Sequence, residues 1–129
     1  MKELGELLTG IKKTMNKPPL VSIIMNCFNG EDFLQEALES VQAQTYKYWE
    51  LIFWDNQSSD KSSTILKSFN DPKFHYYYAK EHRNLYDARN LAIQVSNGDL
   101  VAFLDTDDTW VPQKPVSYTH LTLPTNREV

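Results

Sequence analysis

The sequence predicts an α/β fold with a parallel β-sheet, of the Rossmann-like type. Short apolar runs alternate along the chain with segments of helical periodicity that are ten or more residues long. Several of these runs are nearly continuous in apolar residues, as expected of strands that are covered on both faces. Strands that alternate with helices form βαβ units, and their right-handed crossovers place helices on both faces of a parallel sheet.

The first half of the fold begins with an apolar run, Val21-Ser22-Ile23-Ile24-Met25, which is interrupted at Asn29-Gly30. Residues 31–44 then show helical spacing, and 50–54 (ELIFW) form a second buried run. In the predicted helix, one side carries five apolar residues: Phe33, Leu34, Ala37, Leu38 and Val41.

The second half repeats this alternation. The pattern predicts a helix over 60–69, a turn at Asn70-Asp71-Pro72 and a strand over 73–78. A helix over 84–96 follows, with Gly98 expected as its C-terminal cap, and then a fourth strand over 100–104.

Residues 1–17 form a separate N-terminal segment. An apolar stripe predicts an amphipathic helix before Pro18-Pro19: Leu4, Leu7, Leu8, Ile11 and Met15. Packing on the domain or on a partner is the favoured interpretation, because Glu3 and Glu6 dilute the positive charge. The alternative is peripheral association with a membrane surface.

Residues 115–129 do not continue the pattern. The stretch 116–125 (VSYTHLTLPT) resembles the in-frame translation of a sequencing adapter, so we expect a non-native tail and a natural sequence interrupted near Lys114. A short genuine strand is the alternative. The expected domain is then residues 18–114, truncated after its fourth strand, which would leave 100–104 as an exposed and aggregation-prone edge.

Composition excludes several function classes. The net charge of −4 disfavours binding of nucleic acid through a basic face, and the single cysteine excludes a disulfide framework. No apolar run approaches the ~20 residues that cross a bilayer, and no secretory signal is evident, so a cytoplasmic location, or one at the cytoplasmic membrane face, is expected. The four glycines are too dispersed for a phosphate-binding glycine loop.

Polar residues directly follow three of the apolar runs, where ligands bind in open parallel sheets. The last of these groups is Asp105-Thr106-Asp107-Asp108. Because like charges repel, the three carboxylates favour a hard divalent cation, Mg²⁺ or Mn²⁺. In extended backbone Asp105 and Asp107 would point the same way and could ligate it. The alternative is a solvated acidic loop.

The stretch from Pro19 to Lys114 resembles the N-terminal, nucleotide-binding half of a family 2 glycosyltransferase with the GT-A fold. Three segments carry the resemblance: residues 21–60, beginning VSIIMNCFNG, residues 84–108, ending in FLDTDD, and residues 109–114, TWVPQK. The resemblance implies transfer of a sugar from a nucleotide diphosphate sugar, with a divalent metal at the D-x-D motif. The UDP-linked donor is the best expectation, and the acceptor could be a saccharide, lipid or protein.

The resemblance also implies roles for individual residues. Phe28 would lie against the nucleobase with Asn26 in the same loop, and Asp55 and Asn56 would recognise the base and ribose. Arg89 would contact the nucleotide. Asp105 would face the ribose and the sugar, and Asp105 and Asp107 would bind the metal. The alternatives are purely structural roles: core packing for Phe28, and a surface ion pair with Asp87 or Glu81 for Arg89.

The sequence departs from the family pattern at several positions. Asn26 replaces a usual proline, Asn56 a usual aspartate and Gln57 a usual glycine. The family's general base lies beyond the D-x-D motif, so no catalytic residue is assigned and this chain alone is expected to be inactive in inverting transfer. A non-catalytic nucleotide- or metal-binding module is the alternative function.

Overall fold

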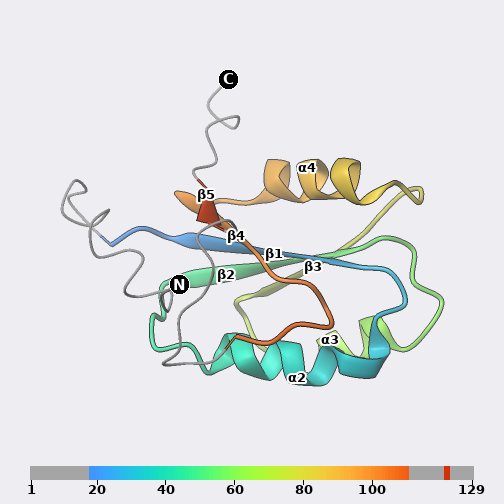
Figure 1. The fold of residues 1–129 in the computed structure, drawn as a ribbon, viewed down its shortest axis with the longest axis horizontal. Coiled ribbons are helices and arrows are strands. Elements are labelled where there is room, and N and C mark those ends of the chain that lie inside the picture. Colours follow the sequence, from blue (N-terminus) through green and yellow to red (C-terminus); the bar gives the residue numbers. More distant parts are fainter. Residues whose placement is uncertain (1–17, 111–120, 123–129) are drawn as a thin grey trace.

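The computed structural model describes residues 18–110 and the backbone of residues 121–122, which form an α/β sandwich around one sheet (Figure 1). The strand order is β3-β2-β1-β4-β5, in which the first four are mutually parallel. The strands are β1 (Val21–Cys27), β2 (Trp49–Asp55), β3 (Phe74–Tyr78), β4 (Leu100–Phe103) and β5 (Leu121–Thr122). The described helices are α2 (Glu31–Gln42), α3 (Ser62–Ser68) and α4 (Leu85–Val95). The predicted α/β fold with a parallel sheet is confirmed.

The central strands are apolar on both faces because helices cover both. Odd-numbered residues of β1, such as Ile23 and Met25, join the larger core with α2 and α3, whereas Ile24 joins a smaller cluster with Ala92 of α4. Among the helices that the structure describes, α2 and α3 lie on one side of the sheet and α4 lies on the other (Figure 1).

Two details of the predicted helices are wrong. Phe33 is 55% exposed, because the buried stripe of α2 begins one residue later, at Leu34. Gly98 does not cap α4, which ends at Val95 with Ser96 as its C-cap, and Gly98 does not adopt a positive φ.

Gly98 instead permits a close approach of two strands. A Cβ atom at Gly98 would lie 2.4 Å from Ser22 Oγ and 2.8 Å from the Leu20 carbonyl oxygen. The Gly98 N–H donates to Ser22 Oγ (2.7 Å), and that hydroxyl donates to the buried carboxylate of Glu50 (2.6 Å). The glycine therefore fixes the start of β4 against the start of β1.

The outer edge of β4 is not fully exposed, in contrast to the expectation. Val101 pairs with Thr122 and Ala102 with Leu121, so this edge is partly covered by β5. The predicted N-terminal helix over 1–17 and most of the segment 115–129 lie outside the described residues. Among the residues that are described, no helix is both long enough and apolar enough to span a membrane.

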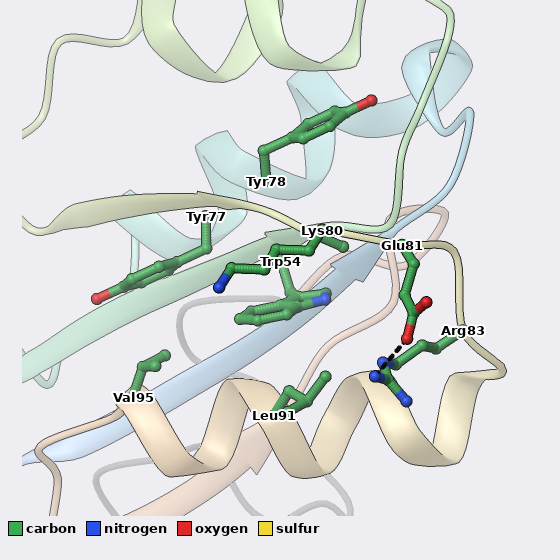
Figure 2. A pocket seen from close by; sticks show the side chains of 9 residues that line it. Trp54, Tyr77, Tyr78, Lys80, Glu81, Arg83, Leu91 and Val95 are labelled. Atoms are coloured by element: carbon green, nitrogen blue, oxygen red, sulfur yellow. Dashed lines mark hydrogen bonds and ion pairs between the residues drawn. The ribbon is translucent and has the colours of Figure 1, made fainter.

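A groove opens beside α4 because one helix does not cover the whole of its sheet face (Figure 2). It has a volume of about 620 Å³. Its apolar wall comes from β2, β3 and α4, through Trp54, Tyr77, Leu91 and Val95. We refer to it below as the α4 groove.

Candidate nucleotide-sugar site

The carboxyl ends of β1, β2 and β4 meet at one edge of the sheet. Cys27 pairs in register with Asp55, and the Asn56 N–H donates to the Cys27 carbonyl (2.7 Å). The Leu104 N–H donates to the Ile24 carbonyl (3.1 Å), which places the loop after β4 beside the same edge. The polar residues that follow each strand are therefore brought to a common rim.

Gly30 joins the loops after β1 and β4. A Cβ atom at this position would lie 2.6 Å from Thr106 Oγ1 and 3.3 Å from Cys27 Sγ. Only a residue without a side chain allows this approach. The loop that carries Phe28 thus packs directly against the loop that carries the aspartates.

Phe28 is an exposed aromatic residue on this rim, with 55% of its surface accessible. Its ring meets that of His82 edge to face, with centroids 4.6 Å apart and an interplanar angle of 67°. This exposure excludes the alternative of core packing. An aromatic face open to solvent is available for stacking on a base.

His82 was not singled out from the sequence, because it lies in an irregular segment between β3 and α4. Its Nδ1 lies 3.0 Å from the carbonyl oxygen of Asn56, which anchors the ring beside Phe28. In the sequence, His82 is only a histidine shortly before a predicted helix. This does not indicate a ligand site unless the fold shows that the residue lies beside Phe28.

Asp55 is a buried carboxylate at the end of β2, with only 1% exposure. One oxygen accepts from the Ser58 N–H (2.8 Å) and the other from the Tyr76 hydroxyl (2.6 Å). Burial raises the pKa of Tyr76, and the Asp55 carboxylate raises it further, so the phenol stays a donor. Asp55 is thus held in a fixed orientation at the rim.

The side chain of Asn56 holds the segment before α4. Its Nδ2 donates to the Arg83 carbonyl (2.6 Å), and its Oδ1 accepts from the Arg83 N–H (3.0 Å). A direct contact of Asn56 with base or ribose stays a prediction. What the structure gives this residue is a positioning role for the loop that carries His82.

Asn26 presents an unsatisfied donor. Its side-chain Nδ2 is buried and has no hydrogen-bond partner among the described residues. Buried polar groups in proteins are generally paired, so an orphaned donor is an observation that a bound ligand would explain.

Arg89 of α4 contacts the aspartate loop. Its Nη2 lies 3.5 Å from Asp105 Oδ1, and its guanidinium lies over the ring of Phe103 at 4.8 Å. The alternative pairing with Glu81 does not occur, because Glu81 pairs with Arg83 at 2.6 Å. Arg89 and Asp105, both expected at the nucleotide, are therefore neighbours.

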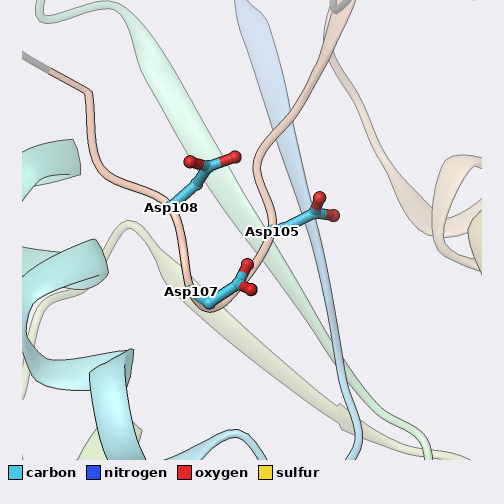
Figure 3. Close-up of side chains that lie close together, drawn as sticks. All are labelled: Asp105, Asp107 and Asp108. Atoms are coloured by element: carbon cyan, nitrogen blue, oxygen red, sulfur yellow. The ribbon is translucent and has the colours of Figure 1, made fainter.

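The acidic residues after β4 form one cluster (Figure 3). Asp105, Asp107 and Asp108 each offer a carboxylate oxygen, and these oxygens lie within 4.8 Å of one another. The prediction for Asp105 and Asp107 assumed extended backbone, and this assumption is wrong. The Asp108 N–H donates to the Asp105 carbonyl and closes a turn. The turn is what adds Asp108 to the pair predicted from alternation.

The family model for glycosyl transferase family 2 matches residues 22–115, which is most of the chain. The chain belongs to glycosyltransferase family 2. This assignment confirms the resemblance carried by the strand-end motifs.

Similar glycosyltransferases come from several bacteria. UDP-Glc:alpha-D-GlcNAc-diphosphoundecaprenol beta-1,3-glucosyltransferase WfgD of Escherichia coli is 37% identical over 95 residues, which is 74% of this chain and 38% of WfgD. The chain spans about two fifths of the length of the curated relatives that it matches.

Solved structures support the GT-A fold. TarS of S. aureus in complex with UDP superposes with a TM-score of 0.67 at 24% identity, over 72% of this chain and 29% of that one. The mannosyltransferase PcManGT from Pyrobaculum calidifontis, in complex with GDP-Man and Mn²⁺, superposes with a TM-score of 0.67 at 21% identity, over 81% of this chain and 35% of that one.

Proposed function

We propose that this chain binds the nucleoside diphosphate of a sugar donor, preferentially UDP, at the carboxyl edge of its sheet. The observation that carries the proposal is the gathering of an exposed aromatic ring, a fixed carboxylate and an acidic cluster at one rim. Phe28 would stack on the base, Asp55 would accept from it, and Arg89 would contact the phosphates. Asn26 would donate its orphaned N–H to the ligand.

Asp105 and Asp107 are proposed to hold Mg²⁺ or Mn²⁺. The donor set fits such an ion, since it consists of carboxylate oxygens that lie close enough to share one cation. When bound, the ion would neutralise the diphosphate and stabilise it as a leaving group. Arg89, whose Nη2 lies 3.5 Å from Asp105 Oδ1, would contribute further positive charge.

For the whole protein we propose inverting transfer of the sugar to an acceptor hydroxyl. A general base in the acceptor-binding part would take up the hydroxyl proton, as that reaction requires. The acceptor would be a saccharide, a lipid or a protein. WfgD, whose name includes a sugar linked to diphosphoundecaprenol, favours a lipid-linked acceptor.

Calorimetric titration of the chain with UDP, with and without Mn²⁺, tests this proposal. We expect binding that is strengthened by Mn²⁺, and we expect Asp107→Asn to remove the strengthening. Glu36→Gln, on an exposed position of α2, is a matched loss of one carboxylate and should change nothing. Binding that ignores both the metal and the Asp107 change would overturn the metal assignment.

The aromatic contact has its own test. Phe28→Ala should weaken UDP binding by about 1–3 kcal/mol, the usual value of one base-stacking contact. Phe33→Ala removes an equally exposed ring on α2 and serves as the control. Equal effects of the two substitutions would exclude stacking on Phe28.

A further inference from the structure

The strand β3 forms one edge of the sheet, and among the described strands only β2 lies beside it. The two strands are joined through the odd-numbered residues of β3 and its flanks. The Lys73 carbonyl accepts from the Leu51 N–H (2.9 Å), and the Ala79 N–H donates to the Asp55 carbonyl (2.8 Å). Because the backbone groups of successive residues point to alternate sides of a strand, the even-numbered residues of β3 turn theirs to the open edge.

Three even-numbered residues therefore present backbone groups at this edge. The N–H and C=O groups of Tyr76 and Tyr78 point outward and have no hydrogen-bond partner in the described part of the chain. The Phe74 carbonyl also points outward, whereas the Phe74 N–H donates to the Asp71 carbonyl (3.0 Å). Unpaired groups of this kind form a template for one more strand.

The sheet is hollowed on both faces beside β3. On one face lies the α4 groove, which Tyr77 and Tyr78 line (Figure 2). On the other face, a hollow of about 420 Å³ lies between α3 and β3, and Phe74 and Tyr76 line it. We refer to it as the α3 hollow. The side chains of a strand added next to β3 would point alternately toward these two hollows.

The composition of β3 does not protect this edge. The strand reads FHYYY, and it contains no proline, no lysine and no interruption of its register with β2. Proline, lysine and bulges are the features by which edge strands usually avoid pairing with another chain. Aromatic residues, in contrast, favour strands and stabilise pairs of them.

We propose that β3 pairs in antiparallel orientation with β3 of a second copy of this chain, about a two-fold axis at Tyr76. The N–H and C=O groups of Tyr76 would exchange two hydrogen bonds with Tyr76 of the second copy. Each Tyr78 N–H would donate to the outward carbonyl of Phe74 in the other copy, which adds two more bonds. Every outward N–H would then have an acceptor, so the edge is complementary to itself, as a two-fold interface requires.

The side chains favour the same register. Residues directly opposite each other would all be aromatic, namely Tyr76 with Tyr76, Phe74 with Tyr78, and His75 with Tyr77. Aromatic pairs between antiparallel strands are stabilising. The pairing would join the two sheets into one continuous sheet, with the same face of each copy on the same side.

Charge does not oppose this pairing. Neither lysine next to β3 would face another lysine, since Lys73 would lie opposite Ala79 and Lys80 opposite Pro72 of the second copy. The α3 hollow carries one charge of each sign, Lys67 and Asp71. The Lys67 ammonium lies over the ring of Tyr76, at 4.6 Å from its centroid.

Sedimentation velocity of the 129-residue chain tests the proposal. We expect a monomer–dimer equilibrium that depends on protein concentration. Tyr78→Pro removes the outward N–H without breaking a bond to β2, and proline is tolerated at such positions of edge strands. It should raise the Kd of the dimer at least about tenfold, because two of the hydrogen bonds across the interface are lost. Tyr78→Thr removes the same exposed ring but keeps the N–H, and it should dimerise more tightly than the proline variant.

Two results would overturn the proposal. The first is a chain that remains monomeric at every concentration. The second is a dimer whose Kd is the same in Tyr78→Pro and Tyr78→Thr, which would place the contact on another surface, such as the part of β4 that β5 does not pair with. Circular dichroism and thermal unfolding of both variants check that the fold is retained.

Disulfide trapping tests the register without proline. In antiparallel strands, opposite residues that share no hydrogen bond have Cα atoms about 4.5 Å apart, which a disulfide can span. We therefore expect His75→Cys combined with Tyr77→Cys to form a covalent dimer under mild oxidation, detected on a non-reducing gel. His75→Cys combined with Tyr78→Cys places the second thiol on the opposite face and should form far less. Cys27 is buried and does not compete. No covalent dimer with the first combination, or equal amounts with both, would overturn the proposed pairing.

Discussion

At the scale of single residues, Gln57 stands where the family pattern has glycine, and the backbone explains that preference. Its φ is 66°, in the left-handed region that disfavours residues with a side chain. The side chain offsets part of this cost, because its amide donates to the carbonyls of Ala79 (3.3 Å) and Lys80 (3.0 Å). Gln57 thus ties the end of β3 to the turn after β2.

Two substitutions at Gln57 separate these effects. Gln57→Ala loses the hydrogen bonds and keeps the strain, whereas Gln57→Gly loses the bonds and relieves the strain. We expect the alanine variant to be less stable than the glycine variant by about 1–2 kcal/mol in urea unfolding. An alanine variant as stable as the glycine variant would show that the turn is not strained.

Cys27 is the one thiol of the chain, and it is 1% exposed. Burial raises the pKa of the Cys27 thiol, which keeps it protonated and unreactive. We expect an alkylating reagent at pH 8 to modify the native protein far more slowly than the urea-unfolded protein. Equal rates would place Cys27 at an open position on the rim.

At the scale of elements, Asp60 connects the starts of two helices. Its carboxylate accepts from the Glu31 N–H at the start of α2 (3.0 Å) and from the Ser62 N–H at the start of α3 (2.9 Å). Partial burial opposes ionisation, but these hydrogen bonds together lower the pKa of Asp60 below its ordinary value.

Because the folded pKa of Asp60 lies below its unfolded value of about 3.9, its contribution to stability is complete above that pH. It is lost as the pH falls through the folded pKa. Asp60→Asn should therefore reduce the free energy of unfolding at pH 7 and flatten its fall at acid pH. Asp32→Asn, on an exposed position of α2, is the control. Parallel pH profiles for Asp60→Asn and the unsubstituted chain would contradict this role.

The junction of β1 and β4 depends on Gly98. Gly98→Ala would place a Cβ atom 2.6 Å from the Ser22 backbone nitrogen and 2.8 Å from the Leu20 carbonyl oxygen, neither of which can move freely. We expect a loss of about 1–3 kcal/mol in thermal or urea unfolding, the usual cost of overpacking. Asn97→Ala, at the exposed neighbouring position, should cost much less.

At the scale of the whole molecule, the alternation of apolar runs and helical segments was enough to predict the parallel sheet and the edge at which the strands preceding Asp55 and Asp105 end. Other features depend on contacts between distant segments, which no local pattern encodes. The role of Gly98 requires Ser22, 76 residues away, and the partner of Phe28 is His82. Asp108 joins the acidic cluster only through a turn that alternation does not describe.

Ligand binding should stabilise the folded chain as a whole. A ligand present at 100 times its Kd adds about 2.7 kcal/mol to the free energy of unfolding. We expect UDP with Mn²⁺ to raise the Tm clearly, and either ligand alone to raise it much less. In Asp107→Asn the combined effect should shrink to that of UDP alone, and a full shift in that variant would contradict the metal assignment.

The absence of a side chain at Gly30 has a further consequence. Because the loop of Phe28 rests directly on Thr106, ordering of one loop restricts the other. A cation that orders the aspartate loop would also order the loop of Phe28. Less conformational entropy of that loop would then be lost when the base binds. By thermodynamic reciprocity, the factor by which the cation tightens nucleotide binding must equal the factor by which the nucleotide tightens cation binding.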